Sequence, residues 1–439
     1  MFRPTGFNDL EGKKVGIFGF GIEGRAAAAR LAQHAELVIV DDSAELGPEV
    51  LQTSQGGLEA LAKCDVVLKS PGISPYRPEV AELAKAVSVT SALNLWMHEI
   101  DRDRVIGVTG TKGKSTTTAL ITFFLNALGE KAQALGNIGL PPYDPSVDTS
   151  EGWLVLEISS FQARDLELAP TLLVLTSLGS DHLDWHGSVE NYHRDKLSIT
   201  HQSPPSNILF ASSIQNQTIG GISNSIEPES NGLTESLGLL GQHNHSNVAL
   251  ALAVVGRATR SDIQEIVSKV TVNAKNFVPL PGRLTEIAKE EVEDCITRYI
   301  DDGLATASLP TIAALSVFPD GDLALIVGGF DRGIEYEPLA EAINSRNART
   351  VVITIGDAGS RIGSLVHKVN DAIHLMHAHD LEGAVKLARS ALNRGGVVLF
   401  SPAAPSFDMY KNWSERSAAF KRIVDSLVNR EQTQSHSTE

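Results

Sequence analysis

Val105-Ile-Gly-Val-Thr-Gly-Thr-Lys-Gly-Lys-Ser-Thr-Thr-Thr118 is the stretch that decides the fold, because it joins a buried strand to a helix through a glycine-rich turn. The apolar run Val105–Val108 predicts the strand, and the segment Thr116–Leu128 predicts a helix that ends at Gly129. Glycines let the backbone N–H groups of such a turn fold around phosphate oxygens, and the helix N-terminus adds partial positive charge. The stretch therefore indicates a phosphate-binding loop.

The loop carries the side chains that nucleoside triphosphate chemistry requires. Lys114 can neutralise the β- and γ-phosphates, and the Ser115 hydroxyl can bind Mg²⁺. The spacing departs from the strict G-x-x-x-x-G-K-[ST] motif, because Val108 stands where the first glycine is expected. A glycine-rich turn without a ligand is the alternative. We expect triphosphate binding, with these contact residues: Gly110, Thr111, Lys112, Gly113, Lys114, Ser115 and Thr116.

Composition excludes several classes of protein. The 439 residues, 42% hydrophobic and 21% charged, are typical of a soluble globular chain with two or three domains. A net charge of −16 argues against general nucleic-acid binding. Cys64 and Cys295 imply no disulfide framework, so a reducing compartment fits. The N-terminus has no apolar segment, and no apolar run approaches the roughly 18 residues of a membrane span. We therefore expect a cytoplasmic protein that does not bind membranes.

The order of strand and helix signals predicts an α/β protein of three domains. Residues 1–103, 104–277 and 278–428 each alternate between apolar runs and helical segments. We expect Rossmann-like N-terminal and C-terminal domains and a central P-loop-type ATPase domain. Residues 203–235, rich in Ser, Asn and Gly, are expected to be surface loops or an irregular excursion, and the polar tail 429–439 to be disordered. The remaining expected strands are Lys14–Phe18, Leu37–Val40, Val66–Leu68, Trp153–Ile158, Thr171–Leu175, Leu323–Val327, Val351–Ile355 and Val397–Phe400, and further helices are Arg25–Gln33 and Leu381–Arg394.

The first block carries a second phosphate-binding pattern. Gly19-Phe-Gly21-Ile-Glu-Gly24 matches G-x-G-x-x-G after a predicted strand, and Asp41 and Asp42 end the next strand. Ser70-Pro71-Gly72 follows the third strand and is expected at the same sheet edge. A dinucleotide or another diphosphate-bearing nucleotide could bind there. A tight turn without a ligand is the alternative.

Three further features of the second block suggest chemistry. Glu157 ends a predicted strand and can reach a Mg²⁺ ion held by Ser115. The segment Asp181-His-Leu-Asp-Trp-His186 contains two histidines and two aspartates, which are good metal ligands, although the lack of cysteine disfavours structural zinc. Lys196 lies on a helix-like segment. The alternatives are a solvated glutamate, a polar loop and a solvated lysine.

In this order, the motifs resemble those of the Mur ligases, the ATP-dependent amino-acid ligases of peptidoglycan synthesis. The resemblance covers almost the whole chain and is strongest to the glutamate-adding members. It rests on the following segments: Gly110–Ser115, Gly136–Pro141, Leu156–Gln162, Asp181–Gly187, Gly241–Asn247, Gly328–Gly333 and Ser401–Asn412.

The resemblance implies a role for each of these signals. The UDP-substrate contacts that it implies are Gly21, Gly24, Asp41, Ser70, Pro71, Gly72, Asn137, Ser159 and Gln162. The ATP contacts beyond the loop would be Asn244, Asn247, Arg283 and Asp302. The catalytic residues would be Lys114, Glu157, His182 and Lys196, and the metal ligands Ser115, Glu157, His182 and Lys196, with two Mg²⁺ ions. Lys196 would carry CO₂ as an anionic carbamate, which binds a metal as a carboxylate does.

The implied activity is the ATP-dependent, ADP-forming addition of glutamate to UDP-N-acetylmuramoyl-L-alanine through an acyl phosphate. Phosphoryl transfer needs in-line positioning and neutralised oxygens, and closure of the domains should assemble the site. We expect a monomer whose partners are small-molecule substrates. A ligase of the folylpolyglutamate synthase type is an alternative, although that family lacks such an N-terminal nucleotide domain. A NAD-dependent oxidoreductase would leave Lys114 and Glu157 unused.

One segment departs from the glutamate-adding members, most of which read Asp-Ser-Lys-Ala-Thr-Asn there. This chain reads Asp302-Gly-Leu-Ala-Thr-Ala307, so Leu304 replaces the lysine that helps to hold glutamate. D-glutamate, the family default, fits if Arg332 or Lys411 compensates. L-glutamate fits if the cationic partners have moved, and Pro405 is a further unusual residue opposite the loop. The remaining candidates for the glutamate pocket are Thr306, Arg332, Ser406 and Trp413.

Overall fold

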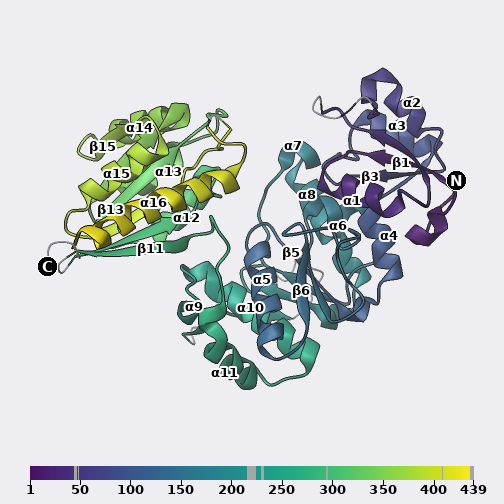
Figure 1. The fold of residues 1–439 in the computed structure, drawn as a ribbon, viewed down its shortest axis with the longest axis horizontal. Helices are drawn as coiled ribbons and strands as arrows, with labels where there is room; N and C mark the ends of the chain where they lie inside the picture. The colour runs from purple at the N-terminus through teal and green to yellow at the C-terminus, as the bar shows by residue number, and fades with distance from the viewer. Residues whose placement is uncertain are drawn as a thin grey trace. The chain divides into compact units, whose positions relative to one another are not determined.

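The computed structural model describes residues 1–43, 47, 49–214, 224–228, 232–292, 295–407 and 409–435, with side chains to residue 428. These residues form three sheets within two compact units (Figure 1). Unit 1 holds residues 1–233 and 245–274, and unit 2 holds residues 234–244 and 275–439. The predicted α/β class is confirmed, and the boundaries at residues 103 and 277 stay predictions.

The first sheet is parallel, with the strand order β2-β1-β3-β4. It is built from β1 (Lys14–Phe18), β2 (Glu36–Val40), β3 (Val66–Lys69) and β4 (Ser88–Thr90), with the helices α1 (Ile22–Leu31), α2 (Leu58–Leu61), α3 (Pro78–Ala86) and α4 (Ala92–Glu99). Strand β1 has the predicted bounds. Helix α1 begins earlier than predicted, directly after Gly21. A Cβ atom on Gly24 would lie 2.0 Å from the Gly19 carbonyl oxygen, which explains the last glycine of the motif.

The second sheet is parallel, with the order β10-β9-β8-β5-β7-β6. Its strands are β5 (Val105–Thr109), β6 (Ala132–Gly136), β7 (Trp153–Glu157), β8 (Leu172–Leu175), β9 (Ile208–Ala211) and β10 (Ser225–Ile226). The helices that follow in unit 1 are α5 (Lys114–Ala127), α6 (Ser160–Asp165), α7 (Leu183–His186), α8 (Val189–Leu197) and α11 (Ile263–Asn273), together with most of α10 (Gln242–Thr259). Val108 pairs with Glu157, so the ends of β5 and β7 lie side by side.

Two predictions about irregular segments need correction. Strand β9 lies inside the stretch 203–235, where only loops were expected, because its apolar run of four residues is flanked by polar sequence. Residues 215–223 and 229–231 of that stretch lie outside the described residues. Helix α16 (Trp413–Ser435) covers the first part of the tail predicted to be disordered, whose Arg, Glu and Gln residues favour helices. Among the described residues, no helix has the length and apolar character needed to cross a bilayer.

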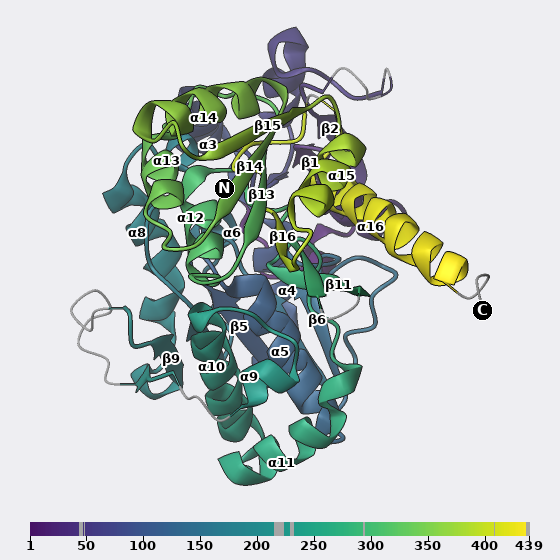
Figure 2. The same ribbon diagram turned by 90° about the vertical axis from the view of Figure 1, so that its left-hand side faces the viewer.

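The third sheet belongs to unit 2 and has the order β11-β12-β16-β13-β14-β15. It contains β11 (Thr285–Val292), β12 (Cys295–Asp301), β13 (Leu323–Gly328), β14 (Thr350–Ile355), β15 (His374–Ala378) and β16 (Gly396–Phe400), and only the β11–β12 pair among them is antiparallel. The helices are α12 (Ser308–Ser316), α13 (Glu337–Asn344), α14 (Gly356–Val369), α15 (Leu381–Ala391) and α16, with α9 (Leu233–Ser236) shortly before. Figure 2 shows α12 and α13 on one side of β13, and α15 and α16 on the other.

Alternating residues of β13 account for these two helical layers. Leu323, Leu325 and Val327 are buried with residues of α12, α13 and α14, whereas Ala324 and Ile326 are buried with residues of α15 and α16. A parallel strand covered on both faces needs such a continuous apolar run. In unit 1, a single hydrophobic cluster includes residues of both sheets, so the first two sheets share a core.

The close approach of Gly24 to Gly19 yields a stability prediction. Gly24→Ala should lower the free energy of unfolding by about 1–3 kcal/mol, because the new methyl group overlaps a backbone oxygen. Urea unfolding followed by circular dichroism measures this change. Gly21→Ala is the matched control, since a Cβ on Gly21 meets no atom within 4 Å. Equal effects of the two substitutions would contradict the packing argument.

Candidate active site

The phosphate loop is held by contacts that bring two lysines to one carbonyl group. Gly110 has φ +145°, and a Cβ there would lie 2.1 Å from the Thr176 hydroxyl, so glycine is required. Its carbonyl oxygen accepts hydrogen bonds from Lys114 Nζ at 3.0 Å and from Lys196 Nζ at 2.8 Å. The structure therefore brings together two predicted catalytic residues that lie far apart in the sequence.

Other loop residues are held by the segment after β8. The backbone N–H of Thr111 donates to the Ser177 carbonyl, and the backbone N–H of Lys112 donates to the Ser177 hydroxyl. The Lys112 ammonium forms an ion pair with Asp181 at 3.2 Å. Ser115 is buried at the start of α5, with Thr116 beside it. The N-terminus of α5 thus has the form that the sequence predicts for a phosphate site.

Lys196 is almost completely buried, with 1% of its surface exposed. Burial and the neighbouring Lys114 lower the pKa of the Lys196 amine well below its ordinary value, although Asp181 and Glu157 oppose the shift. A buried ammonium ion without a strong partner is costly, so burial raises the share of the neutral amine relative to that of an exposed lysine. A neutral amine is the form that reacts with CO₂. The alternative of a solvated lysine is excluded by this burial.

Glu157 provides an acidic group at the end of β7. Its side chain is 1% exposed, and its Oε1 accepts a hydrogen bond from Asn137 Nδ2 at 2.8 Å. Its Oε2 is buried and has no hydrogen-bond partner among the described residues. A buried carboxylate oxygen in this state is suited to a cation, because an unpaired buried acceptor is costly. The alternative of a solvated strand-end glutamate is excluded by its burial.

His182 has an unusual backbone conformation for a histidine. Its φ of +50° lies in the left-handed region, which non-glycine residues adopt at a cost and often at functional sites. The half-exposed ring lies 5.0 Å from the ring of Phe161, measured between centroids. Partial burial lowers the pKa of the imidazole, and Asp181 opposes that shift. The neutral ring can donate a lone pair to a metal.

These groups fit a hard divalent cation held by oxygen and nitrogen ligands. Among the described residues, no group of three or more His, Cys, Asp and Glu side chains could by itself hold a metal. The predicted ligands Ser115, Glu157 and His182 include only two such side chains, so a carbamate on Lys196 would supply the missing acid. Mg²⁺ often completes its shell with water and phosphate oxygens, so a small protein set is sufficient.

Six of the nine predicted UDP-substrate residues lie at the ends of β1, β2 and β3, namely Gly21, Gly24, Asp41, Ser70, Pro71 and Gly72. The Ser70 hydroxyl donates to the Gly19 carbonyl at 2.6 Å, so the Ser70-Pro71-Gly72 turn adjoins the glycine loop. Gly21 lies directly before α1. The Asp41 carboxylate accepts a hydrogen bond from the backbone N–H of Phe20 at 2.6 Å, so Asp41 also shapes the loop. The predicted edge is confirmed for these residues, whereas their ligand stays a prediction.

Ser159 and Gln162 form a capping box at the start of α6, in which each side chain bonds to the backbone of the other residue. Gln162 Nε2 also donates to Glu23 Oε1 at 2.6 Å, and the Tyr143 hydroxyl donates to Glu23 Oε2 at 2.7 Å. Burial raises the pKa of the Glu23 carboxyl. Sequence reasoning missed Glu23 and Tyr143, since neither belongs to a recognisable pattern of its own.

Asn244 and Asn247 lie in the first two turns of α10 and are buried. Asn247 Oδ1 accepts a hydrogen bond from the Thr117 hydroxyl at 3.2 Å, and a Cβ on Gly113 would lie 2.6 Å from the same oxygen. Asn247 therefore adjoins the phosphate loop in unit 1. Asn244 Nδ2 donates to the Leu240 carbonyl at 2.7 Å.

In unit 2, the predicted ATP contact Asp302 has a shifted carboxyl pKa. Burial raises its pKa to about 7, while the Ser401 hydroxyl, which donates to Oδ2 at 2.6 Å, and Arg283 oppose the shift. Asp302 and Arg283 thus influence each other, as expected for residues that share a site. Asp301 beside them is also buried and bonds to Gly282, Gly303 and Ser417.

The predicted glutamate residues lie on three loops and on α16. The Phe330 N–H donates to the Pro405 carbonyl, which places the loop with Arg332 beside the loop with Ser406. The Leu304 N–H donates to the Gly282 carbonyl. A Cβ on Gly282 would lie 2.9 Å from the Trp413 ring, so Trp413 and the Leu304 backbone flank the same glycine. Thr306 follows two residues later, just before α12.

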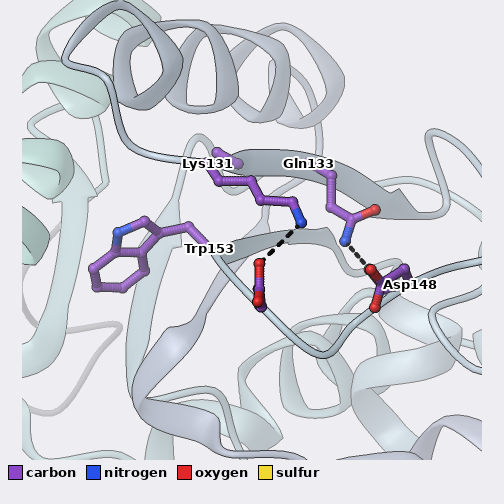
Figure 3. Close-up of a pocket in the computed structure, with 6 residues that line it drawn as sticks. Lys131, Gln133, Asp148 and Trp153 are labelled. Carbon is purple, nitrogen blue, oxygen red and sulfur yellow. Dashed lines mark hydrogen bonds and ion pairs between the residues drawn. The ribbon is translucent and has the colours of Figure 1, made fainter.

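One pocket lies away from all of these residues. It is lined by Lys131, Ala132, Gln133, Asp148, Glu151 and Trp153 (Figure 3). Ala132 and Trp153 begin β6 and β7, so the pocket lies at the edge opposite the phosphate loop. Parallel α/β sheets bind ligands at the carboxyl ends of their strands. Its Lys131–Glu151 ion pair is largely exposed, which is typical of a surface feature.

Comparison with known proteins agrees with this geometry. Residues 108–225 match the Mur ligase middle domain. The UDP-N-acetylmuramoyl-L-alanine–L-glutamate ligase of Salinispora tropica is 35% identical, over 95% of this chain and 98% of the relative. The ligase of that name from Xanthomonas euvesicatoria pv. vesicatoria is 34% identical, over 95% of this chain and 96% of the relative. The chain belongs to the Mur ligase family.

Solved structures of Mur ligases share the fold. The UDP-N-acetylmuramate–alanine ligase MurC of Thermotoga maritima aligns with a TM-score of 0.57 and 17% identity, over 94% of this chain and 99% of that chain. The MurF ligase of Thermotoga maritima, in complex with ADP, aligns with a TM-score of 0.55 and 16% identity, over 96% of each chain. The folylpolyglutamate synthase of Mycobacterium tuberculosis, complexed with ADP, aligns over only 75% of this chain, with a TM-score of 0.52.

The raised pKa of Asp302 predicts how stability depends on pH. The folded state holds this proton up to about pH 7, whereas the unfolded carboxyl loses it near its ordinary value of 3.8. The folded state therefore binds more protons in this window, and the residue's contribution to stability falls as pH rises from about 4 to 7. Asp302→Asn lacks this loss, so the variant should gain melting temperature relative to wild type between pH 5 and pH 8.

Calorimetry at each pH measures the difference in melting temperature. Asp320→Asn is the control, because Asp320 is exposed in the same unit. A difference between Asp302→Asn and wild type that stays constant with pH would refute the assignment.

Proposed function

We propose that this protein is an ATP-dependent, ADP-forming ligase that adds L-glutamate to UDP-N-acetylmuramoyl-L-alanine in the cytoplasmic synthesis of peptidoglycan precursors. The observation that carries the proposal is the meeting of Lys114 and Lys196 at the Gly110 carbonyl, close enough to Glu157 for electrostatic interaction. It occurs in a chain similar over nearly its whole length to ligases of that name.

The UDP part would bind at the edge formed by the glycine loop and the Ser70-Pro71-Gly72 turn. Backbone N–H groups at the start of α1 suit a diphosphate, since a helix N-terminus carries partial positive charge. Asp41 lies at the end of β2, where it can reach the nucleoside. Asn137, Ser159 and Gln162 lie in unit 1 near the end of β7, where the muramoyl-alanine part would extend toward the phosphate loop.

The triphosphate would bind at the N-terminus of α5, with Lys114 neutralising its oxygens. Ser115, Glu157, His182 and a carbamate on Lys196 would hold two Mg²⁺ ions, which neutralise charge on the transferred phosphoryl group. The carbamate forms when the Lys196 amine adds to the carbon of CO₂ and releases one proton. Asn247 and Asn244 would contact the adenine, and Arg283 and Asp302 would contact ATP from unit 2.

Two displacements then make the product. An oxygen of the alanyl carboxylate attacks the γ-phosphorus, and the bond to the β-phosphate oxygen breaks, which gives an acyl phosphate and ADP. The glutamate amine attacks the acyl carbon, loses a proton, and expels inorganic phosphate through an anionic tetrahedral intermediate. Lys114 stabilises the charge that develops on the phosphoryl oxygens in the first step.

The proposed preference for L-glutamate over D-glutamate is argued from Leu304. A charge-assisted hydrogen bond contributes about 1.5–3 kcal/mol, and Leu304 cannot provide the one that a lysine would. Inverting the α-carbon while the amine stays at the acyl carbon moves both carboxylates, so the cationic partners must differ. Arg332, Ser406, Trp413 and Thr306 remain as contacts. The L-glutamate named for the two relatives supports the same choice.

Competition between the two enantiomers tests the proposal. The enzyme is incubated with ATP, UDP-N-acetylmuramoyl-L-alanine, and equal amounts of D-glutamate and isotope-labelled L-glutamate, and the product mass shows which was used. We expect mainly labelled product, by about tenfold or more, because the two enantiomers differ by at least one charged hydrogen bond. Lys114→Ala should form no product and serves as the control. Mainly unlabelled product would refute the L preference, and no product from wild type would refute the ligase assignment.

A further inference from the structure

A chain of four hydrogen-bonded side chains runs through unit 1. The Tyr76 hydroxyl lies 2.8 Å and 2.7 Å from the two carboxylate oxygens of Asp195. Asp195 Oδ2 lies 2.8 Å from His186 Nδ1, and His186 Nε2 lies 2.9 Å from the Ser160 hydroxyl. Ser160, His186 and Asp195 are at most 3% exposed. None of these four residues is among the predicted catalytic, binding or metal-ligating residues.

The four residues join three elements that carry proposed site residues. Tyr76 lies in the loop that begins with Ser70-Pro71-Gly72. Asp195 directly precedes Lys196 in α8. Ser160 begins α6, three residues after Glu157. These hydrogen bonds therefore connect the loop proposed for the UDP part with the elements that hold Lys196 and Glu157.

A second set of contacts joins the same loop to the same region. The Ser74 hydroxyl donates to the Trp185 carbonyl at 2.8 Å, and Trp185 Nε1 donates to the Gly72 carbonyl at 3.1 Å. The Trp185 ring also stacks on Phe161 of α6, with ring centroids 4.5 Å apart. The loop after β3 is thus fixed to α7 directly and to α8 through Tyr76.

The order serine, histidine, aspartate resembles the hydrogen-bonded triad of hydrolases, but burial excludes that chemistry. A nucleophilic hydroxyl must reach its substrate, and Ser160 is 3% exposed while His186 is 0% exposed. The aspartate is also bonded on its far side by Tyr76. The arrangement is suited to holding elements in place.

Asp195 is the residue on which the arrangement depends. Its carboxylate is completely buried, and two arginines lie farther away, with Arg164 Nε at 3.5 Å and Arg194 Nε at 3.7 Å from Oδ1. The shorter contacts to Tyr76 and His186 are therefore its main hydrogen bonds. Removing one partner of a buried charged group leaves that charge poorly compensated, so the helix that carries it should shift.

We propose that Asp195 and Tyr76 are positioning residues that hold α8 so that Lys196 stays at the phosphate loop beside the UDP-substrate loop. This inference rests on the proposed function, since it assigns Lys196 a role in the reaction. Among the described residues, Tyr76 makes no hydrogen bond with Lys196 or the phosphate loop. Its influence would therefore pass through Asp195 and through Arg194 of α8, whose Nη2 donates to the Tyr76 hydroxyl at 2.8 Å. Tyr76→Phe removes only the hydroxyl group and keeps the aromatic ring, so this substitution tests the link.

The test compares full-length wild type, Tyr76→Phe and Asp195→Asn. Each enzyme is equilibrated with ¹³CO₂, and the carbamate resonance, assigned by its loss in Lys196→Arg, is measured per folded molecule. We expect Tyr76→Phe to lower the intensity at least about twofold and kcat about tenfold, because the substitution removes the hydrogen bonds of the hydroxyl to Asp195 and to Arg194, both on α8. The dissociation constant for the UDP-linked substrate should change less than about threefold, because the Tyr76 hydroxyl points to Asp195.

Tyr299→Phe is the matched control, because its hydroxyl donates to the buried Glu290 carboxylate at 2.7 Å in unit 2. It should leave both the carbamate intensity and kcat unchanged. Asp195→Asn should reproduce the effects of Tyr76→Phe if it folds, and Tyr76→Phe alone decides if it does not. Wild-type intensity and kcat in folded Tyr76→Phe, or no resonance in wild type, would overturn the proposal. Ligase product from wild type in the same samples shows whether the proposed function stands independently.

Discussion

The hydrogen bond from Lys196 Nζ to the Gly110 carbonyl is the interaction on which the proposed chemistry depends. It joins α8 to the phosphate loop across 86 residues of sequence, and it keeps the amine out of water. An ammonium ion buried in this way would cost several kcal/mol, which favours the neutral amine or its carbamate. In the proposed mechanism, the position of α8 therefore fixes where a carbamate on Lys196 would form.

The contacts within unit 1 explain why that position can be kept. Lys69 forms a buried ion pair with Asp165 at 2.8 Å, and Gln162 and Tyr143 both bond to Glu23. Each of these contacts joins β3 or α1 of the first sheet's layer to α6 or to the loop after β6. Together with the shared hydrophobic cluster, they make the phosphate loop and the sheet edge proposed to bind UDP parts of one packed body. The polar contacts at this junction are specific, since each buried group has a defined partner.

Sequence patterns predict the regular elements well, because those elements depend on local periodicity. The buried runs of β1, β5, β13 and β14 were located within one residue, and the phosphate loop follows from glycines and Lys114 alone. Strand β9 was missed because a four-residue apolar run in polar surroundings has no distinctive period. The contacts of Tyr76 with Asp195 and of Glu23 with Gln162 could not be predicted, because the partners lie 119 and 139 residues apart. Such pairings arise only when two sheets pack together.

The fate of one oxygen atom tests the central claim that the chain activates a carboxylate as an acyl phosphate. UDP-N-acetylmuramoyl-L-alanine, labelled with ¹⁸O in both oxygens of its alanyl carboxylate, is converted with unlabelled ATP and glutamate, and the released phosphate is analysed by mass spectrometry. The account predicts that one of the two labelled oxygens appears in each phosphate, because the attacking oxygen leaves with phosphorus. Unlabelled phosphate, as water attack on ATP would give, would contradict the account.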